Sequence, residues 1–286
     1  MMKRILTGVA AVVLSSTIGF AGTEKDNPMI DSPTWADLKG DIVGDVQLSD
    51  GTGRVSMEAP FRAFDAATVP VHIAQPADSR DHITTMMLVI DENPSPLVAT
   101  FTFGKAMYPL DLETRVRVNQ YSNIRAIATT ETGDTLMVGR YVKASGGCSA
   151  PAAKDAAAAM ASLGRMKLKQ LEKLTAALNA TDTLQQSVPA SGVRRVAQVM
   201  IKHPNYSGLQ RDQMTHLFIS PRFIDELEVY QGEELLFKLE AGISISTDPS
   251  FRFTYTDNGA DTIRVRASDT EGEVFEQSFP VVRNES

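Results

Sequence analysis

The sequence is poor in cysteine, in histidine and in clustered positive charge. Its 286 residues include one cysteine and four histidines, and the formal net charge is −7. One cysteine cannot form an internal disulfide or the CxxC motif of a disulfide oxidoreductase. No basic run is longer than a pair such as Arg194-Arg195. Because binding to a phosphate backbone needs a clustered basic surface, we expect no nucleic-acid partner.

The first 21 residues have the pattern of a signal peptide. A basic head at residues 1–4 precedes an apolar run at residues 5–20, which ends near the small residues Gly19 and Ala21. The run is short for a membrane-spanning helix, which needs about 20 apolar residues. We expect cleavage after Ala21 and an exported protein without stable membrane insertion. An uncleaved membrane anchor is the alternative.

Residues 34–143 are expected to form a β-sandwich. Short segments with β-branched or aromatic residues at strand spacing cover residues 68–73, 84–90, 98–103, 114–118 and 124–129. Turn compositions separate them, as at residues 91–96 and 131–134. This alternation predicts antiparallel strands.

Residues 144–192 are expected to contain the cysteine motif and a helical linker. Residues 152–178 are rich in Ala, Leu, Lys, Met and Gln, with apolar residues placed to form one stripe on a helix. Gly164 interrupts this pattern, so a continuous helix is only one of the options.

Strand patterns return in residues 193–286 and predict a second sandwich. They cover residues 193–203, 219–230, 235–241, 251–256, 262–268 and 274–281. Residues 231–233, 257–259 and 270–272 have hairpin compositions, and the Asn258-Gly259 pair is the strongest of these signals. We therefore predict a mostly β protein of two sandwich domains joined by a helical linker, which suits the chain length.

The single cysteine, Cys148, lies in a run of small residues from Ser145 to Pro151. Gly146 and Gly147 carry no side chains that would pack this stretch, so we expect an exposed thiol. Pro151 suits the first turn of a helix, whose positive end would lower the pKa of the thiol together with Lys143 and Lys154. A buried, inert cysteine is the alternative.

The four histidines do not complete a catalytic site around this thiol. A cysteine hydrolase needs a positioned base, and His72, His82, His203 and His216 stand in no recognisable catalytic context. Met200 and Met214 lie near two of these histidines and are the kind of ligand that copper accepts, but the spacing fits no standard site. We expect no enzyme activity, no metal and no cofactor.

The motifs resemble a known family, the SoxYZ sulfur carrier, with SoxY-like and SoxZ-like halves fused in one chain. The first half is similar to SoxY at residues 69–71, at residues 91–101 and at Gly146-Gly147-Cys148. The second half is similar to SoxZ at His203-Pro204, Gly208 and Arg211-Asp212, and at residues 221–224, 245–251 and 259–263. The resemblance covers nearly the whole mature chain, and fused carriers associated with quinoprotein dehydrogenases look most similar.

This resemblance implies two immunoglobulin-like sandwiches and a periplasmic carrier. Cys148 would be the covalent attachment site of sulfur-containing intermediates, and Gly146 and Gly147 would form its supporting arm. The implied partners are periplasmic sulfur-oxidation enzymes or a quinoprotein dehydrogenase system. In SoxY the cysteine lies at a free C-terminus between glycines, whereas Cys148 is internal and precedes Ser149-Ala150-Pro151. We therefore expect a loop that is tethered at both ends, which puts thiosulfate oxidation with the usual partners in doubt.

Two other functions remain open at this stage. In the first, the chain is an accessory module that docks onto a periplasmic dehydrogenase that uses pyrroloquinoline quinone, and the cysteine is incidental. In the second, Cys148 forms a disulfide that links two copies of the chain.

Overall fold

The computed structural model describes residues 26–151, 156–171 and 192–283. The expected signal peptide, Lys154 and much of the expected linker lie outside these residues. Within the described residues, no helix is both long and apolar enough to cross a membrane.

The described residues form two short α-helices, two 3-10 turns and fifteen strands. The elements are α1 (Pro33–Val43), β1 (Leu48–Asp50), β2 (Ser56–Glu58), β3 (Val69–Ala74), β4 (Ile83–Ile90), β5 (Leu97–Phe103), η1 (Lys105–Met107), β6 (Asp111–Val116), β7 (Ser122–Thr130), β8 (Thr135–Val142), η2 (Gly147–Ser149), α2 (Ala156–Ala161), β9 (Met166–Leu171), β10 (Arg194–Ile201), β11 (Ile224–Gln231), β12 (Glu234–Ala241), β13 (Ser250–Thr256), β14 (Thr262–Asp269) and β15 (Val274–Pro280). The prediction of a mostly β sandwich protein is confirmed.

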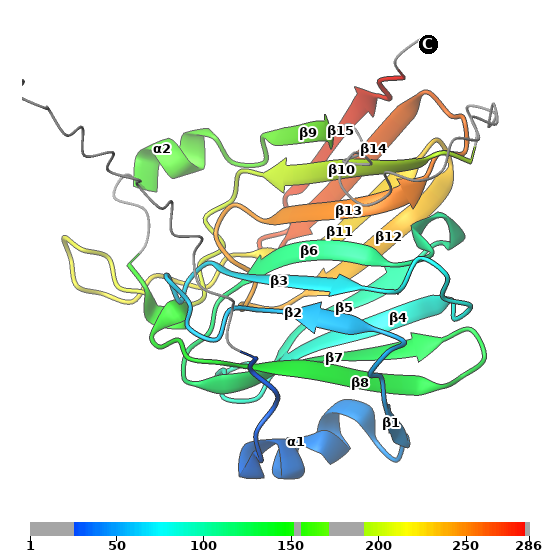
Figure 1. The fold of residues 1–286 in the computed structure, drawn as a ribbon. Helices are drawn as coiled ribbons and strands as arrows, with labels where there is room; N and C mark the ends of the chain where they lie inside the picture. Colours follow the sequence, from blue (N-terminus) through cyan, green and yellow to red (C-terminus); the bar gives the residue numbers. More distant parts are fainter. Residues whose placement is uncertain (1–25, 152–155, 172–191, 284–286) are drawn as a thin grey trace, which may run out of the picture.

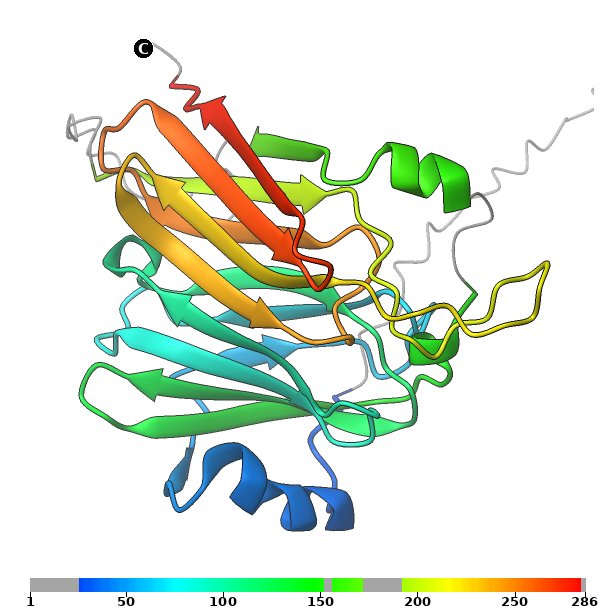
Figure 2. The same ribbon diagram turned by 180° about the vertical axis from the view of Figure 1, so that it is seen from behind.

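Both sheets run through the two halves of the chain (Figures 1 and 2). The nine-stranded sheet has the order β1-β8-β7-β4-β5-β12-β11-β14-β15, and the six-stranded sheet has the order β2-β3-β6-β13-β10-β9. The halves meet edge to edge where β5 pairs with β12 and where β6 pairs with β13. Each half thus contributes strands to both layers, and the boundary between the halves crosses both sheets.

The apolar core is continuous across this boundary. Phe101 of the first half meets Phe251 of the second edge-on, with ring centroids 6.5 Å apart, and Phe237 lies 5.1 Å from Phe253. All four side chains are fully buried. Removing one of these rings would cost about 3–5 kcal/mol by analogy with other buried aromatic residues.

Helix α1 covers the outer face of the nine-stranded sheet, a feature that the sequence analysis did not predict (Figure 1). Ser32 caps its first turn, because its hydroxyl accepts a hydrogen bond from the Trp35 amide at 3.1 Å. Trp35 packs with Val89 and Ile127, and the Arg125 guanidinium lies 4.5 Å from its ring centroid.

The expected helix over residues 152–178 is wrong at residues 166–171, while residues 152–155 and 172–178 lie outside the described residues. Residues 166–171 form β9, which pairs antiparallel with β10. Met166 is buried while Lys167 and Lys169 are exposed, so the side chains alternate with the period of a strand. Gly164 has a φ of 72° and separates this strand from α2.

Two of the three predicted hairpins are confirmed. The turn at residues 231–233 joins the paired strands β11 and β12, and that at residues 270–272 joins β14 and β15. The prediction at residues 257–259 is wrong, because β13 and β14 belong to different sheets. The buried Asp257 carboxylate accepts a hydrogen bond from the Gly259 amide at 2.9 Å, which stabilises a turn that crosses the sandwich.

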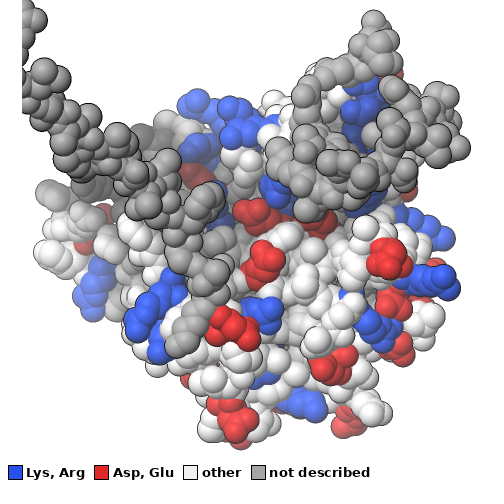
Figure 3. Space-filling view, viewed as in Figure 1, with Lys and Arg blue, Asp and Glu red and all other residues white. Residues whose placement is uncertain are grey.

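Charged side chains of both signs are interspersed on the face shown in Figure 3. The described part of that face carries no extended surface of one sign.

Candidate functional site

Cys148 lies in a tight turn directly after β8, at the boundary between the two halves. Gly146 adopts a left-handed conformation with a φ of 79°, which favours glycine. The Gly147 amide donates to the Val118 carbonyl at 3.0 Å, and a Cβ on Gly147 would lie 2.1 Å from the Ala66 carbonyl oxygen. The two glycines therefore permit a packed turn. The role of Gly146 and Gly147 as the supporting arm of Cys148 stays a prediction.

The thiol of Cys148 is fully buried, at 0% exposure. The prediction of an exposed thiol is therefore wrong. Small residues do not leave the sulfur open here, because the second half of the chain covers the turn. The Ser207 hydroxyl donates to the Cys148 carbonyl, and the Gln210 amide group donates to the Ala150 carbonyl at 3.0 Å. These contacts close the turn from the outside.

A buried arginine approaches the same turn from the first half. Arg117 is 1% exposed and follows β6. Its Nη1 donates to the Gly147 carbonyl at 3.2 Å, and its Nη2 donates to the Asn205 carbonyl at 3.1 Å and to the Thr247 hydroxyl at 2.7 Å. Arg117 therefore connects the cysteine turn to two loops of the second half.

Burial raises the pKa of the Cys148 thiol, whereas attraction to Arg117 and a hydrogen bond with Ser244 act in the opposite direction. The expected lowering of this pKa is wrong, because burial outweighs the effects that favour the thiolate. Lys143 lies against an aromatic ring instead, with its ammonium 4.8 Å from the Phe61 centroid. In this closed arrangement the thiol is protected from reaction.

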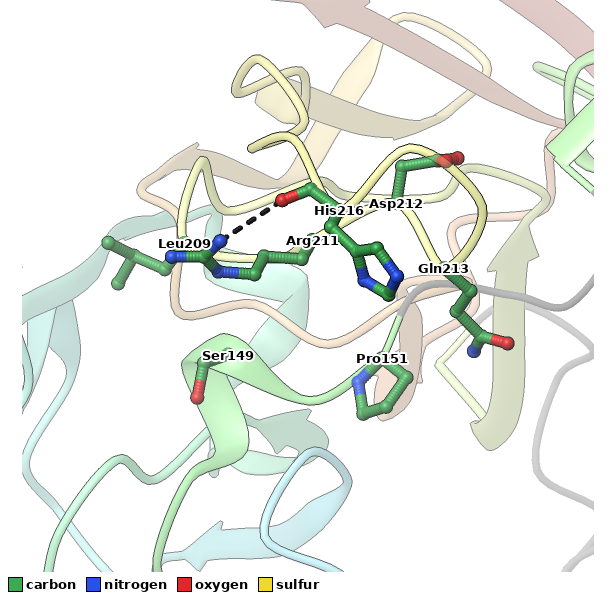
Figure 4. A pocket seen from close by; sticks show the side chains of 7 residues that line it. All are labelled: Ser149, Pro151, Leu209, Arg211, Asp212, Gln213 and His216. Atoms are coloured by element: carbon green, nitrogen blue, oxygen red, sulfur yellow. Dashed lines mark hydrogen bonds between the residues drawn. The ribbon is translucent and has the colours of Figure 1, made fainter.

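A pocket of about 350 Å³ opens beside the turn (Figure 4). Ser149 and Pro151 line it from one side, and the loop from Leu209 to His216 lines it from the other. In Figure 4 the Arg211 guanidinium points back to the His216 carbonyl, to which it donates at 3.0 Å. Ser149 follows Cys148 directly in the chain, but Cys148 itself does not line the pocket.

The hairpin beyond this pocket exposes three large apolar side chains. Met214 is 88% exposed, Leu217 is 69% exposed and Phe218 is 61% exposed. Solvent exposure of neighbouring apolar side chains is typical of a surface that binds another protein.

None of the four histidines is hydrogen-bonded to Cys148 within the described residues. His72 pairs with Asp111 at 2.9 Å, and His82 stacks on Tyr108. His203 is buried and lies 2.7 Å from the Asn205 side chain, so it reaches Arg117 only through that residue. His216 lines the pocket.

The described residues contain no group of three His, Cys, Asp or Glu side chains arranged to hold a metal. The sequence-based expectation that the protein uses no metal or cofactor stays a prediction.

Cys148 could be recognised from the sequence, but the groups that surround it could not. Arg117 was placed within a predicted strand, and Ser207, Gln210 and Ser244 carried no signal of their own. The only available cue was an arginine between Val116 and Val118, a charged residue inside an apolar segment.

The fold and site define a two-layer β-sandwich protein in which one cysteine closes the first half and is covered by the second. The family models divide the chain at the same place. The model described as sulfur oxidation protein SoxY matches residues 39–148, and that described as sulphur oxidation protein SoxZ matches residues 185–280. The chain therefore belongs to the SoxY and SoxZ families, with both domains fused in one polypeptide.

Solved structures resemble parts of the chain. The sulfur carrier protein SoxY from Chlorobium limicola f thiosulfatophilum is 24% identical, with 38% of this chain and 94% of that chain covered and a TM-score of 0.33. A superoxide reductase (neelaredoxin) from Ignicoccus hospitalis is 14% identical, with coverage of 31% and 77% and a TM-score of 0.27. A search of curated proteins finds no match. The assignment therefore rests on the family models.

Proposed function

We propose that this protein is a periplasmic carrier of sulfur-containing intermediates, which it binds covalently through Cys148. One observation carries the proposal: the only cysteine of the chain is the last residue of the SoxY match, and groups of the SoxZ-like half bind the turn that contains it. A cysteine at the meeting point of both domains is a natural attachment site for cargo shared between them. The carrier itself then needs no cofactor.

The burial of Cys148 adds a step to this function. A fully covered sulfur cannot attack or be attacked, so the turn must open before loading and before delivery. The bonds from Ser207 and Gln210 must break on opening, while Gly146 lets the chain fold back afterwards. Because the chain continues past Ser149, the open turn enters a partner as a loop. A closed carrier protects its cargo from reaction with other thiols.

The pocket and the apolar hairpin supply the docking place in this proposal. They lie beside Ser149 and Pro151, the residues that follow the cysteine turn, where a periplasmic sulfur-oxidation enzyme would contact Cys148 once the turn has opened. Met214, Leu217 and Phe218 would pack against that enzyme.

Replacement of Cys148 by serine tests the carrier function in the host. Serine has nearly the same size and can occupy the buried site, so the variant should fold, while it cannot form a disulfide or persulfide. We expect loss of sulfur-compound oxidation in the host, with a circular dichroism spectrum and a urea midpoint close to those of the unchanged protein. Full complementation by Cys148→Ser would refute the proposal.

A second candidate is an accessory module that docks onto a periplasmic dehydrogenase, with the cysteine incidental. The exposed hairpin together with the buried thiol favours it. It predicts that an enzyme co-purifies equally well with Cys148→Ser, and that Phe218→Ser abolishes both co-purification and host activity. The carrier proposal instead predicts that Cys148→Ser retains the partner but loses activity.

A further inference from the structure

Arg117 is a deeply buried arginine that forms no ion pair with a carboxylate in the described part of the chain. Arg125, which is also buried, differs in this respect. Its guanidinium binds the Asp91 carboxylate through two bonds of 2.7 and 2.8 Å. Burial of a charge without an opposite charge is costly, so proteins rarely retain it without a use.

The surroundings of Arg117 hold the guanidinium in place without neutralising it. Its bonds go to the carbonyls of Gly147 and Asn205 and to the hydroxyl of Thr247, which are uncharged. Its Nε has no hydrogen-bond partner. One buried N–H group is therefore free to bind an acceptor.

Arg117 binds the carbonyl of Gly147, next to Cys148, and Cys148 is the ionisable group that acts most strongly on this guanidinium, ahead of the exposed Asp65. Because burial raises the pKa of the thiol, Cys148 compensates this positive charge only when it is ionised or bears an anionic group. His203 is the next ionisable group in the network, through Asn205, and burial lowers its pKa, which disfavours a second positive charge there. The site thus has one fixed positive charge and one sulfur that can become negative or bear a negative group.

We infer that Arg117 is the specificity-determining residue of the carrier: it serves as counter-ion to Cys148 and makes the site prefer cargo with a negatively charged sulfur–oxygen group over neutral cargo. This inference rests on the proposed function, in which Cys148 bears the cargo. A guanidinium is a planar donor that suits the oxygens of an anionic group, and in a buried site the pairing is little weakened by water. A neutral adduct would leave Arg117 uncompensated.

An exchange reaction with sulfite measures this preference. Cys148 is first converted to a mixed disulfide by exchange with bis(2-hydroxyethyl) disulfide, the symmetric disulfide of 2-mercaptoethanol, which releases one equivalent of 2-mercaptoethanol. Sulfite then attacks the Cys148 sulfur, the disulfide bond breaks, a bond between that sulfur and the sulfite sulfur forms, and 2-mercaptoethanol leaves as its thiolate. The dianion sulfite is consumed and two monoanions result, the protein-bound S-sulfonate and the free thiolate, so atoms and charge balance. Intact-mass spectrometry at equilibrium gives the ratio of the two protein adducts.

We expect Arg117→Gln to lower this equilibrium constant about tenfold, equivalent to about 1.4 kcal/mol. Arg117→Lys, which keeps the charge, should restore most of the loss. The matched control is Arg194→Gln. Arg194 also donates to backbone carbonyls, those of Ala106 at 3.0 Å and Pro109 at 2.6 Å, but no bond joins it to the cysteine turn. This control should leave the constant unchanged.

A measurement without variants covers the case in which Arg117→Gln does not fold. The unchanged protein should favour the sulfonate adduct about tenfold more in its native state than in concentrated urea, where Arg117 is no longer held beside Cys148. Equal constants in both states would overturn the inference. Equal constants for Arg117→Gln and the unchanged protein, or an equal loss in Arg194→Gln, would also overturn it.

Failure of the proposed function would be seen elsewhere, as complementation by Cys148→Ser in the host. The exchange constant is independent of that outcome.

Discussion

Release of the cysteine turn should depend on the Gln210 side chain, and this dependence can be measured as the labelling rate of the thiol. Gln210 donates to the Ala150 carbonyl at 3.0 Å and accepts from the Ser207 amide at 3.2 Å, so it joins the turn to the loop that covers it. The first of these bonds must break when the turn opens. A bond of this kind contributes about 0.5–1.5 kcal/mol net.

Gln210→Ala should therefore raise the open fraction of the turn by about two- to twelvefold. Because a buried thiol reacts only from the open state, the rate of labelling by iodoacetamide at neutral pH should rise by the same factor. Stopped samples analysed by mass spectrometry give this rate directly, and the urea midpoint shows whether the whole protein has changed.

Gln170→Ala is a closely matched control. Gln170 also donates to one carbonyl, that of Pro280 at 2.7 Å, and accepts from one amide, that of Val282 at 2.7 Å, but these groups join β9 to the end of β15. The labelling rate of this variant should equal that of the unchanged protein. If both variants accelerate labelling equally, or if neither does, the turn does not open by breaking the Gln210 contact and the reasoning is wrong.

Three further predictions concern other parts of the fold. Gly147→Ala should raise the labelling rate of Cys148, because the added Cβ would lie only 2.1 Å from the Ala66 carbonyl oxygen and force the turn open. An unchanged labelling rate would contradict this prediction and show that the backbone adapts. The His72 imidazole donates a hydrogen bond to the Asp111 carboxylate, which raises the pKa of His72 despite partial burial. His72 should therefore add stability that is fully present below pH about 6.5 and is lost as the pH rises through the folded-state pKa. His72→Gln should make the urea midpoint depend less on pH over this range. Burial opposes ionisation of Asp257, but its hydrogen bonds outweigh burial and hold the pKa of this carboxyl far below its usual range. The stability that the Asp257 carboxylate contributes should therefore be present above pH about 4 and be lost only in stronger acid. Asp257→Asn should lower the free energy of unfolding in urea at neutral pH by about 3–5 kcal/mol, and a loss below about 1 kcal/mol would contradict this.

Most strands could be predicted from the sequence, because their side chains alternate between core and solvent. Val69, Val71 and Ile73 of β3, for example, are all fully buried, while Pro70 between them is exposed. The edge-to-edge joining of the two halves could not be predicted, since β5 and β12 carry the same alternation as any other pair of strands. Nothing local in the sequence specifies which strand lies next to which.

The state of the cysteine could not be predicted either. Glycine and serine around Cys148 suggested exposure, because sequence reasoning considers only what the nearest residues cover. The cover comes from residues far along the chain: Ser207, Gln210 and Ser244. Arg117 was missed for the same reason, since its role depends on the loops that it contacts in three dimensions.

The central claim is that Cys148 carries a covalent sulfur group, and intact-mass measurement on protein isolated from its own host tests it most directly. We predict mass additions on the mature chain that a reductant removes, that map to Cys148 and that are absent from Cys148→Ser. A single unmodified mass, identical with and without reductant during growth on a reduced sulfur compound, would contradict the claim.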